Sequence, residues 1–596
     1  MYAYNGKVLR VNLTDHTIKT EPLDMDLANK FIGGRGLGTK MMMDEVDPRV
    51  DALSPENKMF IVTGPMTGNP VATGGRYMVV TKAPLTGTIA SSNSGGKWGA
   101  ELKFAGWDVI VFEGKSEEPV YLSIVDDKVE LLPATDLWGK VVSKTTKELE
   151  ERHEKGSKIL TIGPGGENLS LMAAIMNDED RAAGRSGVGA VMGSKNLKAV
   201  VVKGSGKPLV PDQEKIKELN KKQLEKIKEN GVTGTGLPTY GTAVLVNILN
   251  ELGSLPTNNF LKGQFDKAEE ISGEALAEKY LVKRTACYRC PIGCGRYVKV
   301  GDWEGGGPEY ETLWSFGSDC GISDMESIIS ANFWCNEMGI DTISVGSTIA
   351  AAIELNQMGL IKEEDLDGIK LEFGNGTDIT EWVKRIGYGQ GLGRKMAEGS
   401  YRLAESYGAP QVSMTVKKME IPAYDPRGVQ GQGLSYATSN RGGCHVRGYM
   451  ISPEVLGLPE QLDRLKTEDK ATWTKIFQDL TASIDSLGVC LFTSFALGAD
   501  DYADMINVIA GTNHTGEDIL EIGDRIYNIE KQFNIISGIE AKEDTLPKRL
   551  LEDGIPEGPS KGHVNRLDEM LPDYYKARGW DENGAPTKEK LEALGL

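Results

Sequence analysis

The chain is poor in cysteine and histidine and has no long hydrophobic run. It contains only seven cysteines and five histidines among 596 residues, and this low, odd cysteine count disfavours a disulfide framework. No window approaches the ~18–20 apolar residues of a membrane span, and the amino terminus lacks a basic region followed by an apolar core. We therefore expect a cytoplasmic protein that does not enter a membrane.

Basic residues are also scarce relative to acidic ones. Lys and Arg number 67 against 86 Asp and Glu, which gives a formal net charge of −19. A surface that is acidic on average repels nucleic acid and anionic lipid. We therefore exclude nucleic acid and membranes as partners.

Short strand signals fill the first 205 residues. Clusters of glycine and proline separate them, and glycine is abundant overall at 72 residues. The stretches with strand character are 8–13, 60–63, 77–81, 108–113, 121–125 and 199–202. No long amphipathic helix is expected before about residue 145, so this part predicts a β-rich domain.

The pattern changes after Pro211. Apolar residues then recur at helical spacing among lysines and glutamates, at Ile216, Leu219, Leu224 and Ile227. We place a domain boundary near residue 208. Farther on, residues 515–518 resemble a helix-capping signature ahead of an apolar helical repeat at 519–533. The remainder of the chain is predicted to be mainly helical, and the fold class to be α+β.

Three of the cysteines lie in one short segment, Cys287-x2-Cys290-x3-Cys294. This spacing allows a single loop to supply three ligands of an iron–sulfur cluster, with a fourth from the remote Cys490. A structural zinc site is the alternative, although such sites usually draw their ligands as two separated pairs and no second pair exists here. The cysteines alone leave both a redox centre and a zinc-stapled binding protein open.

Three glycine-rich segments of the β-rich part look suited to anions. They are residues 73–77 (Thr-Gly-Gly-Arg-Tyr), 91–96 (Ser-Ser-Asn-Ser-Gly-Gly) and 180–187 (Asp-Arg-Ala-Ala-Gly-Arg-Ser-Gly). Backbone amides freed by glycine converge on phosphate oxygens, and a nearby arginine adds a charged fork. Each segment alone also fits an ordinary turn. Since none has a dinucleotide-binding or Walker pattern, the phosphate ligand is predicted to be of another kind.

The second half carries three further polar segments. Asp485, Gly488 and Cys490 lie so close together that a ligand of Asp485 would lie beside whatever Cys490 binds. Residues 336–341 (Asn-Glu-Met-Gly-Ile-Asp) could serve a second copy of that ligand, although they also fit a helix that ends at glycine. His445, with glycines and two arginines around it, fits a polar pocket.

These segments, in this order, resemble the tungsten-containing aldehyde:ferredoxin oxidoreductase family. The likeness runs along the whole chain, through residues 6–13, 189–199, 307–311 (Gly-Pro-Glu-Tyr-Glu) and 423–428. It implies a β-rich, cofactor-cradling domain at 1–208 and two mainly helical domains at 209–416 and 417–596. It also implies a tungsten bis-pterin (tungstopterin), a 4Fe-4S cluster and a Mg²⁺ ion shared by the pterin phosphates.

The resemblance also implies roles for individual residues. The cluster ligands would be Cys287, Cys290, Cys294 and Cys490. Glu311 and His445 would face the substrate, with Tyr310 adjacent. The residues that would bind the pterins and their phosphates are Arg76, Asn93, Gly95, Arg181, Ala182, Ala183, Gly184, Asn336, Gly339, Ile340, Asp341, Arg447, Asp485, Gly488 and Val489. Asn93 and Ala182 would offer carbonyl oxygens to magnesium.

The sequence departs from the family pattern at three places. Asn336 stands where the symmetric pterin motif carries aspartate, so an amide oxygen would replace an ionic acceptor. The family's E-x-x-H bridge between subunits would fall at residues 330–333 (Ser-Ala-Asn-Phe), which cannot bind a metal. We therefore expect a monomer, or a homodimer without the bridging metal. Third, Cys320 lies where a ring-reducing relative uses a cysteine to ligate tungsten.

The function that the resemblance implies is oxidation of small aldehydes to carboxylic acids, with electrons passed through the cluster to ferredoxin. The tungsten subunit of an aromatic acyl-CoA ring reductase is the alternative. Ferredoxins are acidic, so docking on an acidic enzyme needs a local basic surface. A candidate surface surrounds the cysteine segment and consists of Lys283, Arg284, Arg289, Arg296 and Lys299.

Overall fold

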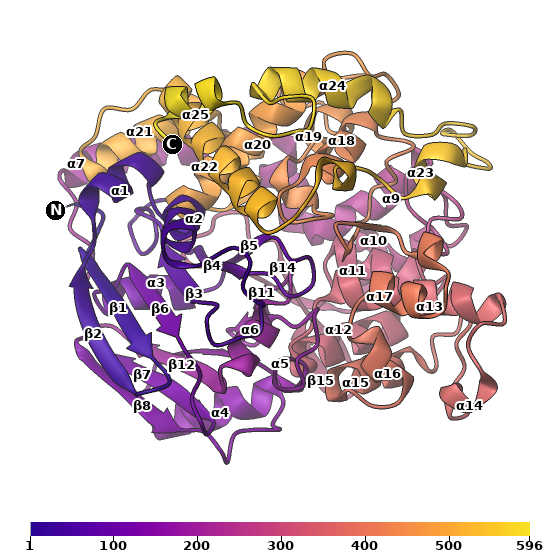
Figure 1. The fold of residues 1–596 in the computed structure, drawn as a ribbon, viewed down its shortest axis with the longest axis horizontal. Coiled ribbons are helices and arrows are strands. Elements are labelled where there is room, and N and C mark those ends of the chain that lie inside the picture. Colours follow the sequence, from indigo (N-terminus) through magenta and orange to yellow (C-terminus); the bar gives the residue numbers. More distant parts are fainter. Residues whose placement is uncertain (1) are drawn as a thin grey trace.

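The computed structural model describes residues 2–596. Two six-stranded sheets lie in the first third of the chain, and helices form most of the remainder (Figure 1). The α+β prediction is confirmed. The first sheet has the order β2-β1-β6-β3-β4-β5. Its strands are β1 (Lys7–Asn12), β2 (Thr17–Pro22), β3 (Met59–Thr63), β4 (Tyr77–Lys82), β5 (Ile89–Ser94) and β6 (Val109–Glu113).

The second sheet has the order β11-β10-β9-β12-β7-β8 and mixes parallel and antiparallel pairs. Its strands are β7 (Val120–Val125), β8 (Lys128–Pro133), β9 (Lys158–Thr161), β10 (Ile175–Asn177), β11 (Arg181–Ala183) and β12 (Leu197–Lys203). All six predicted strand regions are therefore strands.

The first sheet is buried on both faces, because alternate side chains of a strand point to opposite sides. In β4, Tyr77 and Val79 join the core shared with the second sheet. Met78 and Val80 point the other way, into the core formed with the helices. The first sheet is thus a middle layer, and its loops lie between the second sheet and the helical part.

One helix of the β-rich part was missed: α2 (Gly34–Glu45) packs on β3 and β4. Its sequence begins Gly-Arg-Gly-Leu-Gly, and glycine opposes helix formation by ~1 kcal/mol per residue relative to alanine. Packing explains the glycines. A Cβ at Gly36 would lie 2.7 Å from the Ile526 side chain, and one at Gly38 would lie 2.6 Å from Val80. The prediction was that no long amphipathic helix precedes residue 145, and α2 has no distinct apolar face, so that pattern could not reveal it.

The predicted helix after Pro211 is α7 (Gln213–Glu229). Ile216, Leu219 and Ile227 are buried as expected, but Leu224 is 40 % exposed. The buried residue of that turn is instead Gln223, whose amide donates to the Asp501 carbonyl at 3.0 Å. Residues 216, 219, 223 and 227 follow the 3.6-residue helical repeat more closely than a set containing 224.

The predicted capping signature begins α22 (Gly516–Ile536). Thr515 Oγ1 accepts from the Asp518 N–H at 3.2 Å, and Asp518 accepts from the Thr515 N–H at 2.7 Å. The apolar repeat at 519, 522, 526, 529 and 533 is buried, as predicted. The domain boundaries proposed at residues 208 and 416 stay predictions.

Long helices dominate after residue 208. The main ones besides α7 and α22 are α12 (Met325–Met338), α13 (Thr342–Gln357), α15 (Ile379–Tyr388), α18 (Gln430–Thr438), α20 (Lys470–Leu487), α21 (Ala499–Ala510) and α24 (Leu567–Arg578). Among residues 2–596, none of the helices combines the length and the apolar composition that crossing a membrane requires.

Candidate active site

The four predicted cluster cysteines line one small cavity. Cys287, Cys290 and Cys294 lie on the loop between β13 (Leu281–Thr285) and β14 (Gly295–Val300), and Cys490 precedes the short helix η7 (Leu491–Phe495). Within residues 2–596, no three His, Cys, Asp or Glu side chains approach closely enough to hold a single metal ion. The four cysteines, from two distant segments of the chain, thus face one cavity.

Arg76 forms one wall of this cysteine cavity. Its guanidinium donates to Cys490 Sγ at 3.1 Å and to Asn93 Oδ1 at 3.0 Å. Burial alone lowers the pKa of Arg76, but the neighbouring Cys490 and Cys287 groups raise it above its ordinary value. A Cβ at Gly95 would lie 2.8 Å from Cys287 Sγ. Glycine at 95 therefore lets the loop, the arginine and the thiol meet.

A larger cavity of about 560 Å³ shares Arg76, Cys287 and Cys294 as walls. Segments that are far apart in the sequence meet around it. The predicted site residues that line it, besides these three, are Gly95, Arg181, Ala182, Gly184, Tyr310, Glu311, Asn336, Ile340, Asp341 and His445.

The large cavity has a charged part and an apolar part. Arg76 and Arg181 supply positive charge beside the cysteines. The apolar part is lined by Val232, Leu237, Leu245, Ile248, Leu456, Phe492 and Phe495. A volume of this size accommodates an organic cofactor or ligand, and the two arginines suit anionic groups.

Glu311 and His445 meet inside the cavity. Glu311, on α11 (Tyr310–Leu313), places Oε1 3.6 Å from His445 Nε2, and its Oε2 accepts from the Ala423 N–H at 3.0 Å. Burial raises the pKa of Glu311 to about 8. Burial, and then Arg185, holds the pKa of His445 well below its ordinary value. Both groups are therefore uncharged at neutral pH.

This pair has unused hydrogen-bonding capacity. Glu311 Oε1 and His445 Nδ1 are buried and have no hydrogen-bond partner among the described residues. A buried polar atom without a partner costs ~1–3 kcal/mol. A bound ligand that offers polar atoms would remove this cost.

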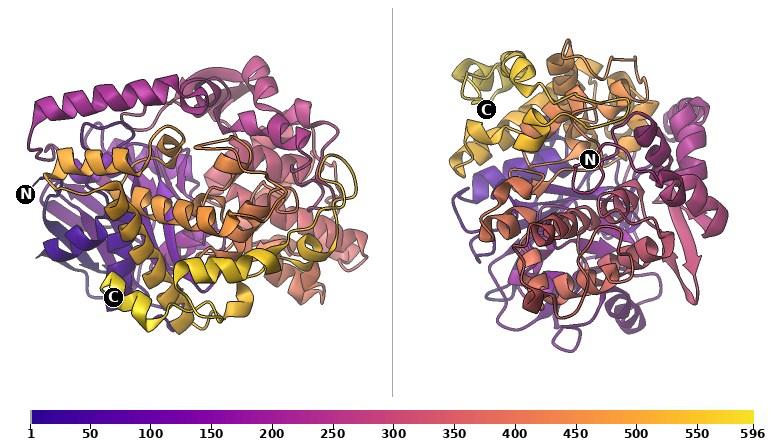
Figure 2. Two further views of the ribbon diagram at one scale, coloured as in Figure 1. Left: turned by 90° about the horizontal axis from the view of Figure 1, so that it is seen from above. Right: turned by 90° about the vertical axis from the view of Figure 1, so that its right-hand side faces the viewer.

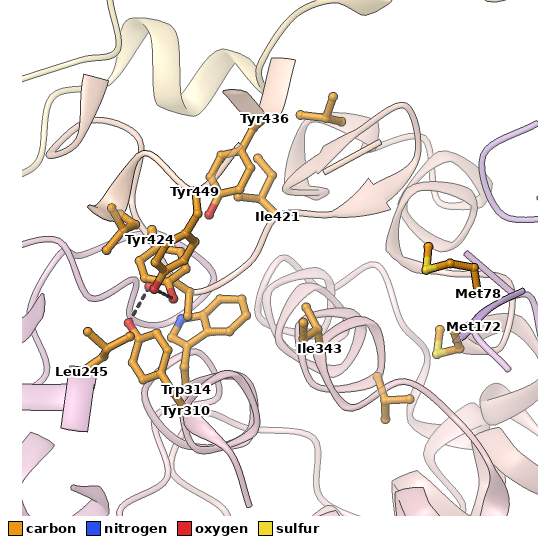
Figure 3. Close-up of a cluster of buried hydrophobic side chains, with 14 of the residues drawn as sticks. Met78, Met172, Leu245, Tyr310, Trp314, Ile343, Ile421, Tyr424, Tyr436 and Tyr449 are labelled. Atoms are coloured by element: carbon orange, nitrogen blue, oxygen red, sulfur yellow. Dashed lines mark hydrogen bonds between the residues drawn. The ribbon is translucent and has the colours of Figure 1, made fainter. Parts of the chain in front are cut away.

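A group of tyrosines surrounds the Glu311–His445 pair. The Tyr310 hydroxyl donates to the Ala423 carbonyl at 2.6 Å, and the hydroxyls of Tyr424 and Tyr449 lie 2.9 Å apart. Figure 3 shows these three hydroxyl groups close together. Tyr424 also packs near His445, with ring centroids 5.9 Å apart. The predicted Tyr310 is thus hydrogen-bonded to the main chain. Tyr424 and Tyr449, which the sequence analysis did not assign to the site, pack beside the His445 ring.

Asp485 is the centre of a buried network beside Arg76. It accepts from Asn93 Nδ2 at 3.2 Å and pairs with Arg447 and Arg35. Arg447 keeps its Nε without a partner, and burial together with Arg35 lowers the pKa of Arg447 to about 10. Gly488 and Val489 follow at the end of α20. These residues support the wall of the large cavity rather than line it.

The corresponding segment on the other side of the cavity lies between α12 and α13. Asp341 caps α13 by accepting from the Ile343 and Ser344 N–H groups, and it also accepts from Arg185 at 3.1 Å. Gly339 ends α12 in the left-handed conformation, as the helix-end interpretation predicted. Ala183 does not face the cavity, because it is buried in the core between the sheets.

Three further sequence features have clear positions. Cys320 is buried and does not line the large cavity; its thiol lies 3.2 Å from the Ser315 carbonyl oxygen and 3.4 Å from that of Gly346, and donates its one hydrogen between them. Residues 330–333 lie within α12, where Asn332 donates to the Gly306 carbonyl. Arg296 was predicted to belong to the basic docking surface, but it is 3 % exposed and its guanidinium is bound by backbone carbonyls.

The sequence interpretation missed several residues of the site. Arg185 donates to the Gly443 and Glu420 carbonyls and so joins three segments near Asp341. Glu309 lines the cavity and accepts from Thr242 Oγ1 at 2.6 Å. Arg185 lies in the glycine-rich segment 180–187 and Glu309 in the motif 307–311, so the sequence analysis had singled out both segments without these two residues. Tyr449 lies in none of the segments singled out.

Comparisons with known proteins identify the family. A family model for the N-terminal domain of aldehyde ferredoxin oxidoreductase matches residues 8–204, and one for domains 2 and 3 matches residues 218–596. The chain belongs to the aldehyde ferredoxin oxidoreductase family. Full-length relatives support this assignment. The chain is 55 % identical to tungsten-containing aldehyde ferredoxin oxidoreductases of Pyrococcus abyssi and Pyrococcus furiosus, over 100 % of this chain and 99 % of each relative.

The chain is also similar to proteins with other names. The WOR-like subunit of an aliphatic sulfonate oxidoreductase from Pyrococcus furiosus is 33 % identical, over 100 % of this chain and 97 % of its own length. Among solved structures, the active-site complex BamBC of benzoyl coenzyme A reductase has a TM-score of 0.86 at 26 % identity, and covers 100 % of this chain and 97 % of that one. The aldehyde ferredoxin oxidoreductases are therefore much nearer in sequence than the ring reductase.

Proposed function

We propose that this oxidoreductase converts aldehydes to carboxylic acids and transfers the electrons, one at a time, to ferredoxin. The observation that carries the proposal is the Glu311–His445 pair, which lies in the same cavity as Cys287, Cys294 and the arginines Arg76 and Arg181. The 55 % identity to aldehyde ferredoxin oxidoreductases along the full chain supports it. Cys320 is buried and is not among the residues that line the large cavity, which disfavours the ring-reductase alternative.

The residues of the two cavities fit the cofactors of this family. Cys287, Cys290, Cys294 and Cys490 would hold the 4Fe-4S cluster. Arg76, Arg181 and the amides near Gly95 and Gly184 would hold the pterin phosphates, with Asp341 toward the pterin rings. Asp485 does not line the large cavity, so its part would be to hold Arg447 and Asn93 in place. The carbonyl oxygens of Asn93 and Ala182 would bind Mg²⁺. When bound, the tungsten–pterin group supplies a two-electron redox centre, and the cluster supplies the one-electron outlet.

Glu311 would accept protons from the reacting groups and release them to solvent. The conversion of an aldehyde and water to a carboxylic acid releases two electrons and two protons. A carboxylate whose pKa lies near the working pH is suited to accept a proton and then release it, and burial brings the pKa of Glu311 to about 8. The Ala423 N–H holds Oε2, so Oε1 remains available toward the cavity.

His445 would orient the substrate rather than exchange its proton. Its depressed pKa keeps the imidazole neutral, so a ring N–H donates a hydrogen bond to a carbonyl oxygen without adding a full charge. Tyr424, against the imidazole ring, restricts its orientation. A positioned neutral donor of this type stabilises the charge that develops on a carbonyl oxygen.

An anaerobic assay tests the proposal. Protein loaded with tungsten and iron should reduce ferredoxin only when an aldehyde is present, with two ferredoxins reduced and one carboxylate formed per aldehyde. Benzoyl-CoA serves as the competing substrate for the ring-reductase alternative. Turnover of benzoyl-CoA without aldehyde oxidation would overturn the proposal. The monomer, or homodimer without a bridging metal between subunits, that residues 330–333 lead us to expect remains part of the proposal.

A further inference from the structure

A basic and partly apolar surface covers the cysteine loop. Lys283 and Arg284 on β13 are exposed, as is Arg289 in the loop itself. Val282, directly before Lys283, is 52 % exposed, which is unusual for an apolar residue in this molecule. β13 is an edge strand of the small sheet β13-β14-β15, where β15 is Trp303–Gly306. Figure 2 shows this sheet at the periphery of the molecule.

The positive charges of this surface are available to a partner. Lys283 Nζ lies 4.5 Å over the Tyr297 ring, and Arg284 reaches only a backbone carbonyl at 3.5 Å. Neither contact neutralises the charge. Lys299 differs, because Glu304 is its cross-strand neighbour. Since Arg296 is buried, the surface is smaller than the five-residue patch expected from the sequence. It is the edge formed by β13 and the cysteine loop, where Lys283 and Arg284 leave opposite faces of the strand. It consists of Val282, Lys283, Arg284 and Arg289.

The loop that carries three of the cysteines reaches solvent next to this surface. Cys287, Cys290 and Cys294 are partly exposed, whereas Cys490 is buried. Arg289, between two of these cysteines, has a left-handed φ of 48° and projects from the loop, and its carbonyl accepts from the Thr73 N–H. The loop conformation thus holds a cation directly outside the cysteines.

We propose that this surface docks a small acidic protein that carries one electron. The inference rests on the proposed function and adds the face that the electron partner uses. The whole chain, at −19, repels an acidic partner at long range, so productive encounter requires a local patch of opposite charge. Electron-transfer interfaces are typically small, below ~1,200 Å². A few cations around one exposed apolar side chain fit that size.

The test compares two double variants of the loaded enzyme. Lys283→Glu with Arg284→Glu reverses the charge of the surface. Lys19→Glu with Lys576→Glu makes the same change in net charge at two exposed lysines, on β2 and α24. The measurements are kcat/KM for an acidic ferredoxin across a range of ionic strength, and aldehyde-dependent reduction of benzyl viologen, a small cationic dye.

The surface variant should lose ~10-fold or more in kcat/KM for ferredoxin at low salt, with a flatter salt dependence, because steering by charge accounts for ~10–1,000-fold in association rate. Dye reduction should be unchanged, and the control pair should keep most of its ferredoxin activity.

Equal losses in both double variants would overturn the inference, as would full activity of the surface variant. A change from dimer to monomer in the surface variant, seen by sedimentation, would show that the surface binds a second copy instead. Absence of dye reduction in the unmodified enzyme would instead refute the proposed function.

Discussion

At the residue scale, the account depends on Glu311 and its surroundings. The family motif identified Glu311 and His445 as substrate-facing, but it could not reveal that both are buried with unpaired polar atoms. Those properties come from Ala423, Arg185 and the tyrosines, which lie far away in the sequence. The sequence could therefore name the two residues of the proposed catalytic pair, whereas the environment that sets their protonation required the packed structure.

Replacing the carboxyl group tests its role. Glu311→Gln keeps the size and removes the proton acceptor, so turnover should fall ~100-fold or more. Iron and tungsten contents should be unchanged, since the side chain is not a proposed ligand of either. His445→Gln, which keeps a hydrogen-bond donor, is the matched variant and should retain more activity. Near-full turnover of Glu311→Gln would place the base elsewhere.

The pH dependence follows from the pKa of Glu311, about 8. Below that pH the carboxyl holds its proton and cannot accept another, and above it the carboxylate predominates. We expect kcat/KM to rise with pH through about 8 and then level off. The Glu311→Gln variant should lack this rise. A rise of the same size in the variant would assign the titration to another group.

Cys320 offers a test between the two enzyme classes. Its thiol is buried, and the pKa of that thiol is raised well above the ordinary value by burial. Cys320→Ser should therefore leave tungsten content and aldehyde turnover essentially intact, with a loss of stability of ~1–3 kcal/mol for the altered buried group. Loss of tungsten from this variant, with iron retained, would favour the ring-reductase alternative.

At the scale of single elements, strands were easier to predict than the helix that supports the site. The strand regions of both sheets stand out through β-branched and aromatic residues between turns. The glycine-rich start of α2 counts against a helix on propensity, and only close packing accounts for it. Gly34 has φ +38°, and a Cβ there would lie 2.2 Å from the Asp485 carbonyl oxygen. The start of α2 therefore abuts the proposed pterin-binding segment.

This contact predicts a large effect of a small substitution. Gly34→Ala should lower the free energy of unfolding by ~2–4 kcal/mol, through backbone strain and overpacking, and should also reduce tungsten incorporation. Gly498→Ala is the control, because its φ is −101°, nothing lies within 4 Å of the added Cβ, and it does not line the large cavity. The urea midpoint and the metal content of both variants give the comparison. Equal stability of the two would contradict the packing argument.

At the scale of the whole molecule, the site is an assembly of distant segments. The large cavity takes residues from Arg76 to Phe495, and the cysteine cavity joins one loop to the start of η7. Local sequence patterns predicted the cysteine loop at 287–294, the cap of α22 and the glycine-rich turns of the β-rich part. They could not predict which segments meet, because that depends on the layering of two sheets and the helices. The resemblance of ordered motifs supplied this information instead.

The most direct test of the central claim is metal analysis of anaerobically purified protein, combined with electron paramagnetic resonance after addition of an aldehyde. The account predicts about four irons and about one tungsten per chain, a cluster signal that appears on aldehyde addition, and loss of iron in Cys290→Ala. About one zinc per chain with no iron, and no signal with aldehyde, would contradict it.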